Sequence, residues 1–335
     1  LIPKIYAETE SVSVFGGEEL TPPQYGKVFV TIKPFYGPYV PDSIKENLNQ
    51  KLRKYSVAGI VTEILDLKYL YVESHINAYY NPNLASSADS LKTVISNNIT
   101  SYSESSEMNK YGAKFKYSKF QTVVDNSNAA ITSNITKVEI RRDLKPLLNQ
   151  NAEYELCFGN PFYIKNSDGY NIRSSGFTML GLSSVVYLSD IPDENGLTGT
   201  LFVFKLESRN NPVIVADNVG TVDYERAEIL LKPINITNTV KNVQEIPIIE
   251  ISACPKSNDI IGLQDLYLQL DINNSTVDMI SDSIVAGESS SGTNYTATSS
   301  YVQGDIARLT DTETLNTTLT TSDTYTLGSY DIAPL

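Results

Sequence analysis

The stretch FGGEELTPPQYGKVFVTIKP, residues 15–34, carries the most specific structural information in the chain. Its glycine pair, Gly16 and Gly17, permits a close approach of two backbone segments or a positive φ. Pro22 and Pro23 then stiffen an extended segment, because the proline ring restricts φ. Constrained residues this close together predict a segment that is important for the structure.

After the prolines, the chain turns into its first regular strand. Tyr25 and Gly26 form the turn, and the side chains then alternate with a period of two until Pro34 ends the pattern, which predicts a strand from 27 to 33. If Gly17 has a positive φ, replacing it with Val should distort this region. We call the following residues the signature segment: Phe15, Gly16, Gly17, Glu18, Pro22, Pro23, Tyr25, Gly26 and Lys27.

Beyond the signature segment, residues 27–148 show helical and strand periodicity in turn. Asp42 follows a proline and is a good helix N-cap, and Ser86 or Ser87 caps a second helix. The predicted order is a strand at 27–33, a helix from 42 to 59, two strands within 61–80, helices near 88–102 and 118–124, and a strand near 132–142. This order predicts an N-terminal α/β sandwich with helices on one face of an antiparallel or mixed sheet.

The composition changes twice further along the chain. Short apolar strands separated by turn clusters replace the helical periodicity and predict a mainly β domain. From Ser281 to Leu335, 21 of 55 residues are Ser or Thr. Such a segment buries little by itself, so it either orders against another surface or is disordered alone. The predicted fold class is α+β, divided into a lead-in linker (1–26), an α+β domain (27–148), a mainly β domain (149–262) and an extended, Ser/Thr-rich C-terminal arm (263–335).

The net charge argues against two classes of partner. The 335 residues include 26 basic and 39 acidic side chains, which give a formal net charge of −13. Phosphate groups and anionic membrane surfaces both attract clustered Lys and Arg, so we expect neither a nucleic-acid nor a membrane partner. No apolar run reaches membrane-spanning length, and no signal peptide opens the sequence. The start at Leu1 indicates a piece of a longer protein.

Histidine and cysteine provide no recognisable catalytic set. His75 is the only histidine, which excludes a two-histidine metal site, and no G-x-S-x-G motif accompanies it. Cys157 and Cys254 have no partner at metal-ligand spacing, so we predict that they are small packing residues. Two cysteines are typical of a reduced, intracellular assembly site, although they leave one isolated disulfide open.

Carboxylates also provide no specific catalytic signal. The candidate pairs Asp190/Asp193 and Asp217/Asp223 lie in turn-like sequence, where Asp is favoured for local hydrogen bonding. We therefore predict that the chain is not an enzyme and has no catalytic residue, cofactor or metal site.

The signature segment resembles the family of large wedge proteins in the baseplate of T-even-type, contractile-tailed phages, which is related to the baseplate J-like family. Relatives often carry an aromatic residue, commonly Trp, at the position of Phe15. The resemblance continues through the α+β region, and the whole chain resembles the C-terminal half of such a protein.

This resemblance implies a structural, non-enzymatic protein of the virion tail baseplate, assembled in the host cytoplasm. Family members self-associate as dimers, contact other wedge proteins and link neighbouring wedges into a ring around the tail hub. The ring stays connected while the baseplate changes shape to trigger sheath contraction.

A carbohydrate-binding tail or adhesin module is the alternative function. The chain contains 22 Tyr, 10 Phe and no Trp, and tyrosine rings suit wet interfaces because the ring is buried while the hydroxyl is paired. The β-rich second half and the Asn-, Ser- and Thr-rich loops are compatible with this alternative. The signature segment argues against it, since an independent lectin module has no reason to carry that motif.

Overall fold

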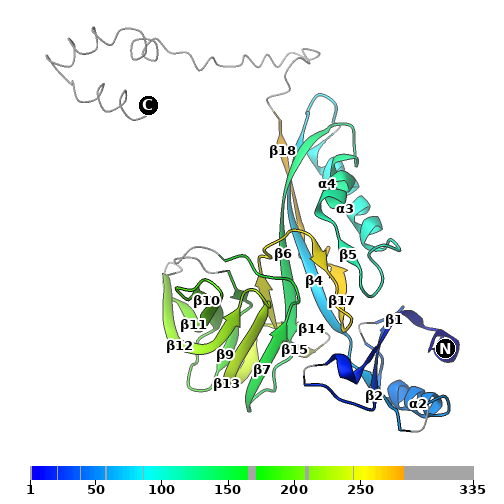
Figure 1. The fold of residues 1–335 in the computed structure, drawn as a ribbon. Coiled ribbons are helices and arrows are strands. Elements are labelled where there is room, and N and C mark those ends of the chain that lie inside the picture. The colour runs from blue at the N-terminus through cyan, green and yellow to red at the C-terminus, as the bar shows by residue number, and fades with distance from the viewer. Residues whose placement is uncertain are drawn as a thin grey trace, which may run out of the picture. The chain divides into compact units, whose positions relative to one another are not determined.

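The computed structural model describes residues 2–20, 22–37, 39–56, 59–85, 87–164, 171–207, 211–243 and 245–282. In these ranges the strands form sheets of three, six, seven and two strands (Figure 1). The fold is mostly β, with helices beside two of the sheets. The Ser/Thr-rich part of the predicted C-terminal arm, from residue 283 onward, lies outside the described residues.

The signature segment belongs to the three-stranded sheet, whose order is β1-β2-β3. The strand β1 (Thr9–Gly16) runs antiparallel to β2 (Lys27–Pro34), and β2 runs parallel to β3 (Val61–Leu65). Parallel neighbours need a crossover connection, which the helix α2 (Asp42–Arg53) supplies. The predicted strand and the existence of the helix that follows it are thereby confirmed. Asp42 is the first helical residue rather than the cap, and the helix ends at Arg53, before the predicted end at Gly59.

A small hydrophobic core holds α2 against this sheet. Val30 and Ile32 share one face of β2 and pack with Leu48 and Leu52 of α2. The spacing of two residues in the strand and four in the helix places each pair on one face of its element. The amphipathic patterns of β2 and α2 therefore account for the packing of this helix on the three-stranded sheet.

The predicted lead-in linker, residues 1–26, is wrong. This range contains a short helix, α1 (Ile2–Ile5), the strand β1, and a 3-10 turn, η1 (Gly17–Glu19). β1 pairs with β2 along its length, and Ile2 is buried in the same small core as α2. Within β1, Val12 and Val14 alternate with Ser11 and Ser13, a period of two that the sequence analysis did not recognise before Gly16 and Gly17.

The strand β4 (Lys68–Tyr80) is central in the seven-stranded sheet. It pairs antiparallel with β6 (Ile131–Leu144), and it runs parallel to β17 (Leu266–Leu270) and then to β18 (Thr276–Ser281). The strand β15 (Ile246–Ala253) continues the sheet beyond β6. Two short strands pair with β15, namely β8 (Arg173–Ser174) and β14 (Lys241–Val243).

The helices α3 (Ala88–Ser103) and α4 (Tyr117–Asp125) lie beside β4 and β6 (Figure 1). Ser87 caps α3, because its side-chain oxygen accepts a hydrogen bond from the Ser90 amide at 3.1 Å. The buried stripe of α3 consists of Leu91, Ile95 and Ile99. Between α3 and α4 in the sequence, β5 (Lys114–Phe115) forms a two-stranded ladder with β16 (Ile260–Ile261).

The six-stranded sheet closes into a small barrel. Its strands are β7 (Asn151–Cys157), β9 (Phe177–Met179), β10 (Val186–Pro192), β11 (Thr198–Glu207), β12 (Asn211–Asp223) and β13 (Glu228–Thr239). Closure depends on β13, which pairs with β12 through its first four residues and with β9 through three of its last four. The predicted mainly β character of this region is thus found in the structure.

Two further predicted boundaries are wrong. The range 27–148 is not one sandwich, because β2, α2 and β3 have their own sheet and core, and a second sheet begins at β4. The range 263–335 does not begin as an arm, because β17 and β18 pair with β4, and Leu266, Leu268 and Leu270 are buried. These pairings join residues about 200 positions apart in the sequence, so no local period signals them.

Candidate functional site

Phe15 and Phe29 anchor the signature segment on the face of the three-stranded sheet that faces away from α2. They are cross-strand partners, and their stacked rings have centroids 5.7 Å apart. Both side chains are buried, at 5% and 3% exposure. The Lys27 ammonium lies 5.8 Å from the Phe29 ring centroid and pairs with Glu63 at 2.9 Å. This packing explains why position 15 carries an aromatic residue.

Gly17 is constrained by a close approach of two backbone segments and not by a positive φ. Its carbonyl accepts hydrogen bonds from the Gln24 amide at 2.7 Å and from the Leu20 amide at 3.3 Å. A Cβ at Gly17 would lie 2.0 Å from the Gln24 carbonyl oxygen. A side chain therefore cannot be added without moving the backbone that leads into β2.

Gly26 has the positive φ that turns the chain into β2. Its φ is +76°, and its carbonyl accepts a hydrogen bond from the Val61 amide at 2.9 Å. This bond lies at the start of the parallel pairing between β2 and β3. The remaining signature residues are at the surface: Glu18, Pro22, Pro23 and Tyr25 are exposed, and Tyr25 is 80% exposed.

An apolar groove of about 420 Å³ opens on the face of the three-stranded sheet that carries α2. Its lining contains no charged side chain and consists of Ile2, Pro3, Val12, Val14, Val28, Val30, Leu52, Tyr55, Ser56, Ile60 and Thr62. Tyr55 and Val14 are 66% and 55% exposed. We call this feature the apolar groove. The sequence analysis missed it, because the groove combines four separate segments of the chain.

A cluster of tyrosines connects the three-stranded sheet to the seven-stranded one. The ring of Tyr267 on β17 meets Tyr111 and Tyr69 edge-on, with centroids 5.2 and 6.0 Å apart, and Tyr69 stacks on Tyr71 at 5.4 Å. Lys33 of β2 lies over the Tyr267 ring, 5.9 Å from its centroid. Burial raises the pKa of Tyr111 to about 12 and those of the other three hydroxyls above their usual value. These hydroxyls therefore stay protonated at neutral pH.

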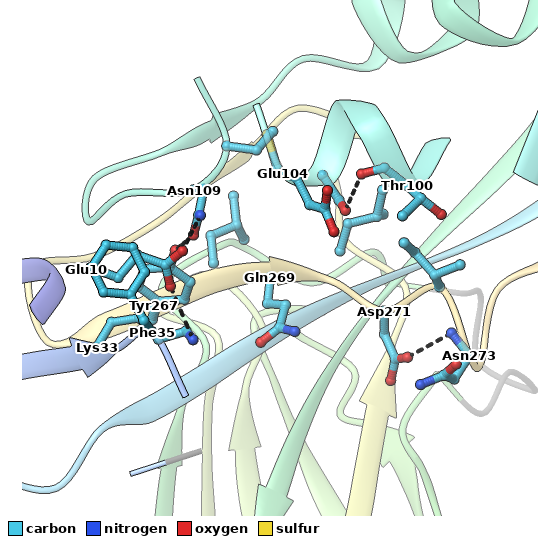
Figure 2. Close-up of a pocket in the computed structure, with 15 residues that line it drawn as sticks. Glu10, Lys33, Phe35, Thr100, Glu104, Asn109, Tyr267, Gln269, Asp271 and Asn273 are labelled. Atoms are coloured by element: carbon cyan, nitrogen blue, oxygen red, sulfur yellow. Dashed lines mark hydrogen bonds and ion pairs between the residues drawn. The ribbon is translucent and has the colours of Figure 1, made fainter. Parts of the chain in front are cut away.

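A polar pocket of about 460 Å³ lies beside Tyr267 (Figure 2). At one end, Glu10 accepts a hydrogen bond from the Asn109 side chain at 2.5 Å and pairs with Lys33 at 3.2 Å. The Tyr267 hydroxyl donates to the Asn109 side-chain oxygen. These groups connect β1, β2, β17 and the segment after α3, so this end of the pocket acts as a joint within the chain.

Arg141 of β6 is the centre of a buried charge cluster. Its guanidinium is covered by the Tyr71 ring, with Cζ 4.4 Å from the ring centroid. The residue is 4% exposed. Its ion-pair partners lie at 2.8, 3.2, 3.1 and 2.8 Å and are, in that order, Glu73, Asp143, Glu250 and Asp271. Although burial alone would lower the pKa of Arg141, these carboxylates raise it above its usual value.

Three possible metal ligands lie beside this cluster on β4 and β6. The ligand atoms of Glu73, His75 and Glu139 all lie within 4.8 Å of one another. The His75 Nδ1 is 3.1 Å from the Thr276 hydroxyl on β18. Burial raises the pKa of Glu73 to about 7, against the lowering effect of Arg141. The sequence analysis considered His75 alone and did not find this group.

The comparisons with known proteins match two segments of the chain. Residues 1–65 match the family described as baseplate structural protein gp6, C-terminal domain I, and residues 68–143 match its C-terminal domain III. Each of the two segments is therefore similar to a C-terminal domain of baseplate structural protein gp6. The predicted resemblance to the C-terminal half of a T-even-type wedge protein is confirmed by these matches. Comparison with curated protein sequences gave no match.

The two gp6 segments follow the boundaries of the structure. The domain I match ends where β3 ends, and the domain III match begins where β4 begins. The domain III match supplies β4, α3, α4 and β6, while β15, β17 and β18 complete the same sheet from residues beyond the match. The seven-stranded sheet, part of which matches domain III, is therefore discontinuous in sequence, and the barrel strands lie between its parts.

Asp190 and Asp193, one of the carboxylate pairs considered in the sequence analysis, each have hydrogen-bond partners within the fold. Asp190 is fully buried and accepts hydrogen bonds from the Asn171 and Ile172 amides, at 2.8 and 2.7 Å, and from the Tyr224 hydroxyl at 2.6 Å. Burial raises the pKa of Asp190, and these hydrogen bonds oppose the rise. Asp193 accepts a hydrogen bond from the Thr198 hydroxyl at 2.7 Å in an exposed turn. The structure does not bring Asp193 into the bonding network of Asp190.

No disulfide joins Cys157 and Cys254. Burial and the neighbouring Glu228 raise the pKa of Cys157 to about 11. Its thiolate is thus scarce at neutral pH, which disfavours a nucleophilic role. No helix in the described part of the chain combines the length and apolar character that a bilayer crossing needs.

Proposed function

We propose that this chain is a structural subunit of a phage tail baseplate wedge that self-associates and links neighbouring wedges into a ring around the hub. The ring would stay connected during the rearrangement that triggers contraction. The match of two segments to C-terminal domains of baseplate structural protein gp6 carries the proposal. The subunit would act in the virion, contact other wedge proteins and be assembled in the host cytoplasm.

The apolar groove supports self-association. It is an uncharged surface in a chain with 65 charged residues (26 basic plus 39 acidic). The cores of obligate interfaces are likewise apolar and depleted in charge. We therefore assign the groove to contact with a second copy of this chain. In the described part of the chain, β1 and β3 are edge strands, so their free backbone groups could extend the contact.

The polar pocket offers the carbohydrate-binding alternative one exposed aromatic ring in its lining, that of Phe35. Sugar recognition commonly uses an exposed aromatic face as a platform. Tyr267 is 2% exposed and has rings packed edge-on around it. Phe35, at 54% exposure, is the other aromatic residue that lines the pocket. A structural subunit therefore accounts for more of the described features.

Light scattering behind size exclusion, over a hundredfold concentration range, tests the proposal. We expect a mass near 74 kDa, twice the 37.0 kDa of one chain. A Tyr55→Glu variant places a charge at the exposed rim of the apolar groove and should weaken association by at least tenfold, because an unpaired charge would be desolvated in the contact.

The matched control is Leu197→Glu in a turn of the barrel, where the side chain is 52% exposed. We expect this variant to associate like the unaltered chain. A constant mass of 37.0 kDa at every concentration would contradict self-association of this part of the protein. Equal weakening by both substitutions would contradict the assignment of the apolar groove.

A further inference from the structure

We propose that Glu73, His75 and Glu139 form a binding site for one divalent transition-metal ion, for which zinc is the probe. The three side chains lie on one face of the seven-stranded sheet where β4 and β6 pair. Glu73 is directly opposite Glu139 in the register, and His75 follows two residues later on the same face. Their ligand atoms already lie within 4.8 Å of one another.

The carboxylates keep donor atoms for an ion. Arg141 makes its shortest contact with Glu73 at Oε1, 2.8 Å away, and Arg173 makes its shortest contact with Glu139 at Oε1, 3.6 Å away. The Cys254 thiol also lies against this oxygen of Glu139, at 3.9 Å. Within the described ranges, Oε2 of neither carboxylate accepts a hydrogen bond. Each glutamate can therefore bind a cation while it keeps its present arginine.

The histidine has a hydrogen-bond partner that suits a metal ligand. The Thr276 hydroxyl on β18 lies 3.1 Å from Nδ1 of His75. If Nδ1–H donates to this hydroxyl, the lone pair of Nε2 is left for the ion, and the ring orientation is restrained. Such outer hydrogen bonds commonly fix the tautomer of a metal-binding histidine.

The local charge favours a divalent cation. Five carboxylates gather here, those of Glu73, Glu139, Asp143, Glu250 and Asp271, and the cations paired with them are Arg141, Arg173 and Lys241. Lys137, opposite His75, is exposed and makes no ion pair with these acids in the described part of the chain. Buried charges require compensation, and one divalent ion would supply two positive charges.

The donor set selects the class of metal. One imidazole nitrogen and two carboxylate oxygens suit zinc and neighbouring transition metals, whereas magnesium and calcium prefer oxygen ligands alone. Zinc bonds of about 2.0–2.2 Å require the ligand atoms to move together from their present spacing. Side-chain rotation can supply this movement, since Glu139 is partly exposed and lies beside Glu73. A fourth position would remain for water or for a group from another protein.

Zinc titration of the full chain, followed by metal analysis and NMR of ¹⁵N-labelled histidine, tests the site. The single histidine makes the spectrum unambiguous, because only His75 contributes signals. We expect about one zinc per chain at saturation, a large shift of one ring nitrogen of His75, and a higher melting temperature with zinc, since the ion binds only the folded chain. Magnesium at the same concentration should leave the histidine signals in place.

Variants separate this site from general binding to an acidic surface. His75→Ala and Glu139→Gln should each abolish the stoichiometric site, and Thr276→Val should weaken zinc binding about 10- to 100-fold through the lost outer hydrogen bond. Asn77→Ala, on the same face of β4 and exposed, should bind like the unaltered chain.

Several outcomes would overturn the inference. They are failure of the unaltered chain to bind zinc, unchanged histidine signals at zinc saturation, or equal zinc binding by His75→Ala. Circular dichroism of each variant establishes that it is folded. If a variant does not fold, the NMR result on the unaltered chain decides alone.

Discussion

Gly17 shows how one residue can be essential to local geometry without an unusual φ. Its carbonyl accepts hydrogen bonds from two amides that follow it, and a methyl group in place of its hydrogen would overlap the Gln24 carbonyl. Gly26 has the other role of glycine, a positive φ at a turn. The sequence pattern of the signature segment is thus explained by two different backbone constraints.

Gly17→Ala should lower the free energy of unfolding by about 1–3 kcal/mol, because the added Cβ must displace backbone atoms of the segment before β2. Gly16→Ala is the matched control. Gly16 has φ −78° and ψ 148°, and a Cβ there meets only the flexible Glu18 side chain, at 3.2 Å. Its effect should stay within about 0.5 kcal/mol. Urea unfolding measures both values, and similar midpoints for the two variants would contradict the role given to Gly17.

Among the elements, β4 does most to organise the fold. It carries an apolar face toward the main core and a polar face that includes Tyr71, Glu73 and His75. Neighbours on both sides satisfy its backbone, antiparallel on one side and parallel on the other. The helices α3 and α4 are held beside it by their buried stripes, and α3 depends in addition on a specific N-cap.

Ser87→Ala should destabilise the chain by about 1 kcal/mol, because the Ser90 amide would lose its only side-chain acceptor at the start of α3. Ser87→Asp should retain most of the stability, since a carboxylate accepts the same bond and interacts favourably with the helix N-terminus. The measurement is the urea midpoint of each variant. Equal destabilisation by Ala and Asp would show that the cap is not what stabilises α3.

The chain as a whole combines its segments out of sequence order. β17 and β18 return to pair with β4, and β15 extends the same sheet after the chain has formed the barrel. Hydrophobic residues of the barrel and of the seven-stranded sheet form one continuous core, whereas the three-stranded sheet has its own. The polar contacts around Glu10 and Tyr267 connect the three-stranded sheet to the seven-stranded sheet.

A chain shortened to residues 1–282 should unfold cooperatively, whereas one shortened to residues 1–262 should not. The shorter chain lacks β17 and β18 and the buried side chains of Leu266, Leu268 and Leu270. At about 1.5–3 kcal/mol each, the loss approaches the total stability of a typical domain. Thermal unfolding monitored by circular dichroism distinguishes the two, and equal melting temperatures would contradict the placement of β17 and β18 in the sheet.

By itself, the sequence determined most helices and strands and the constrained character of the signature segment. These depend on local periodicity, on caps such as Ser87, and on glycine and proline, which act over a few residues. The family resemblance likewise depended on one continuous stretch of sequence, the signature segment. The period of two in a strand also places Glu73 and His75 on one face, since both lie within the range 61–80 that was predicted to form strands.

Only the tertiary structure decided which strands share a sheet, that residues 1–26 belong to the fold, and where the apolar groove lies. It also brought Glu139 to Glu73, which is 66 positions earlier (139 − 73). Strand pairing over such separations depends on the burial and the backbone hydrogen bonds of the assembled sheet, and no local pattern in the sequence records them.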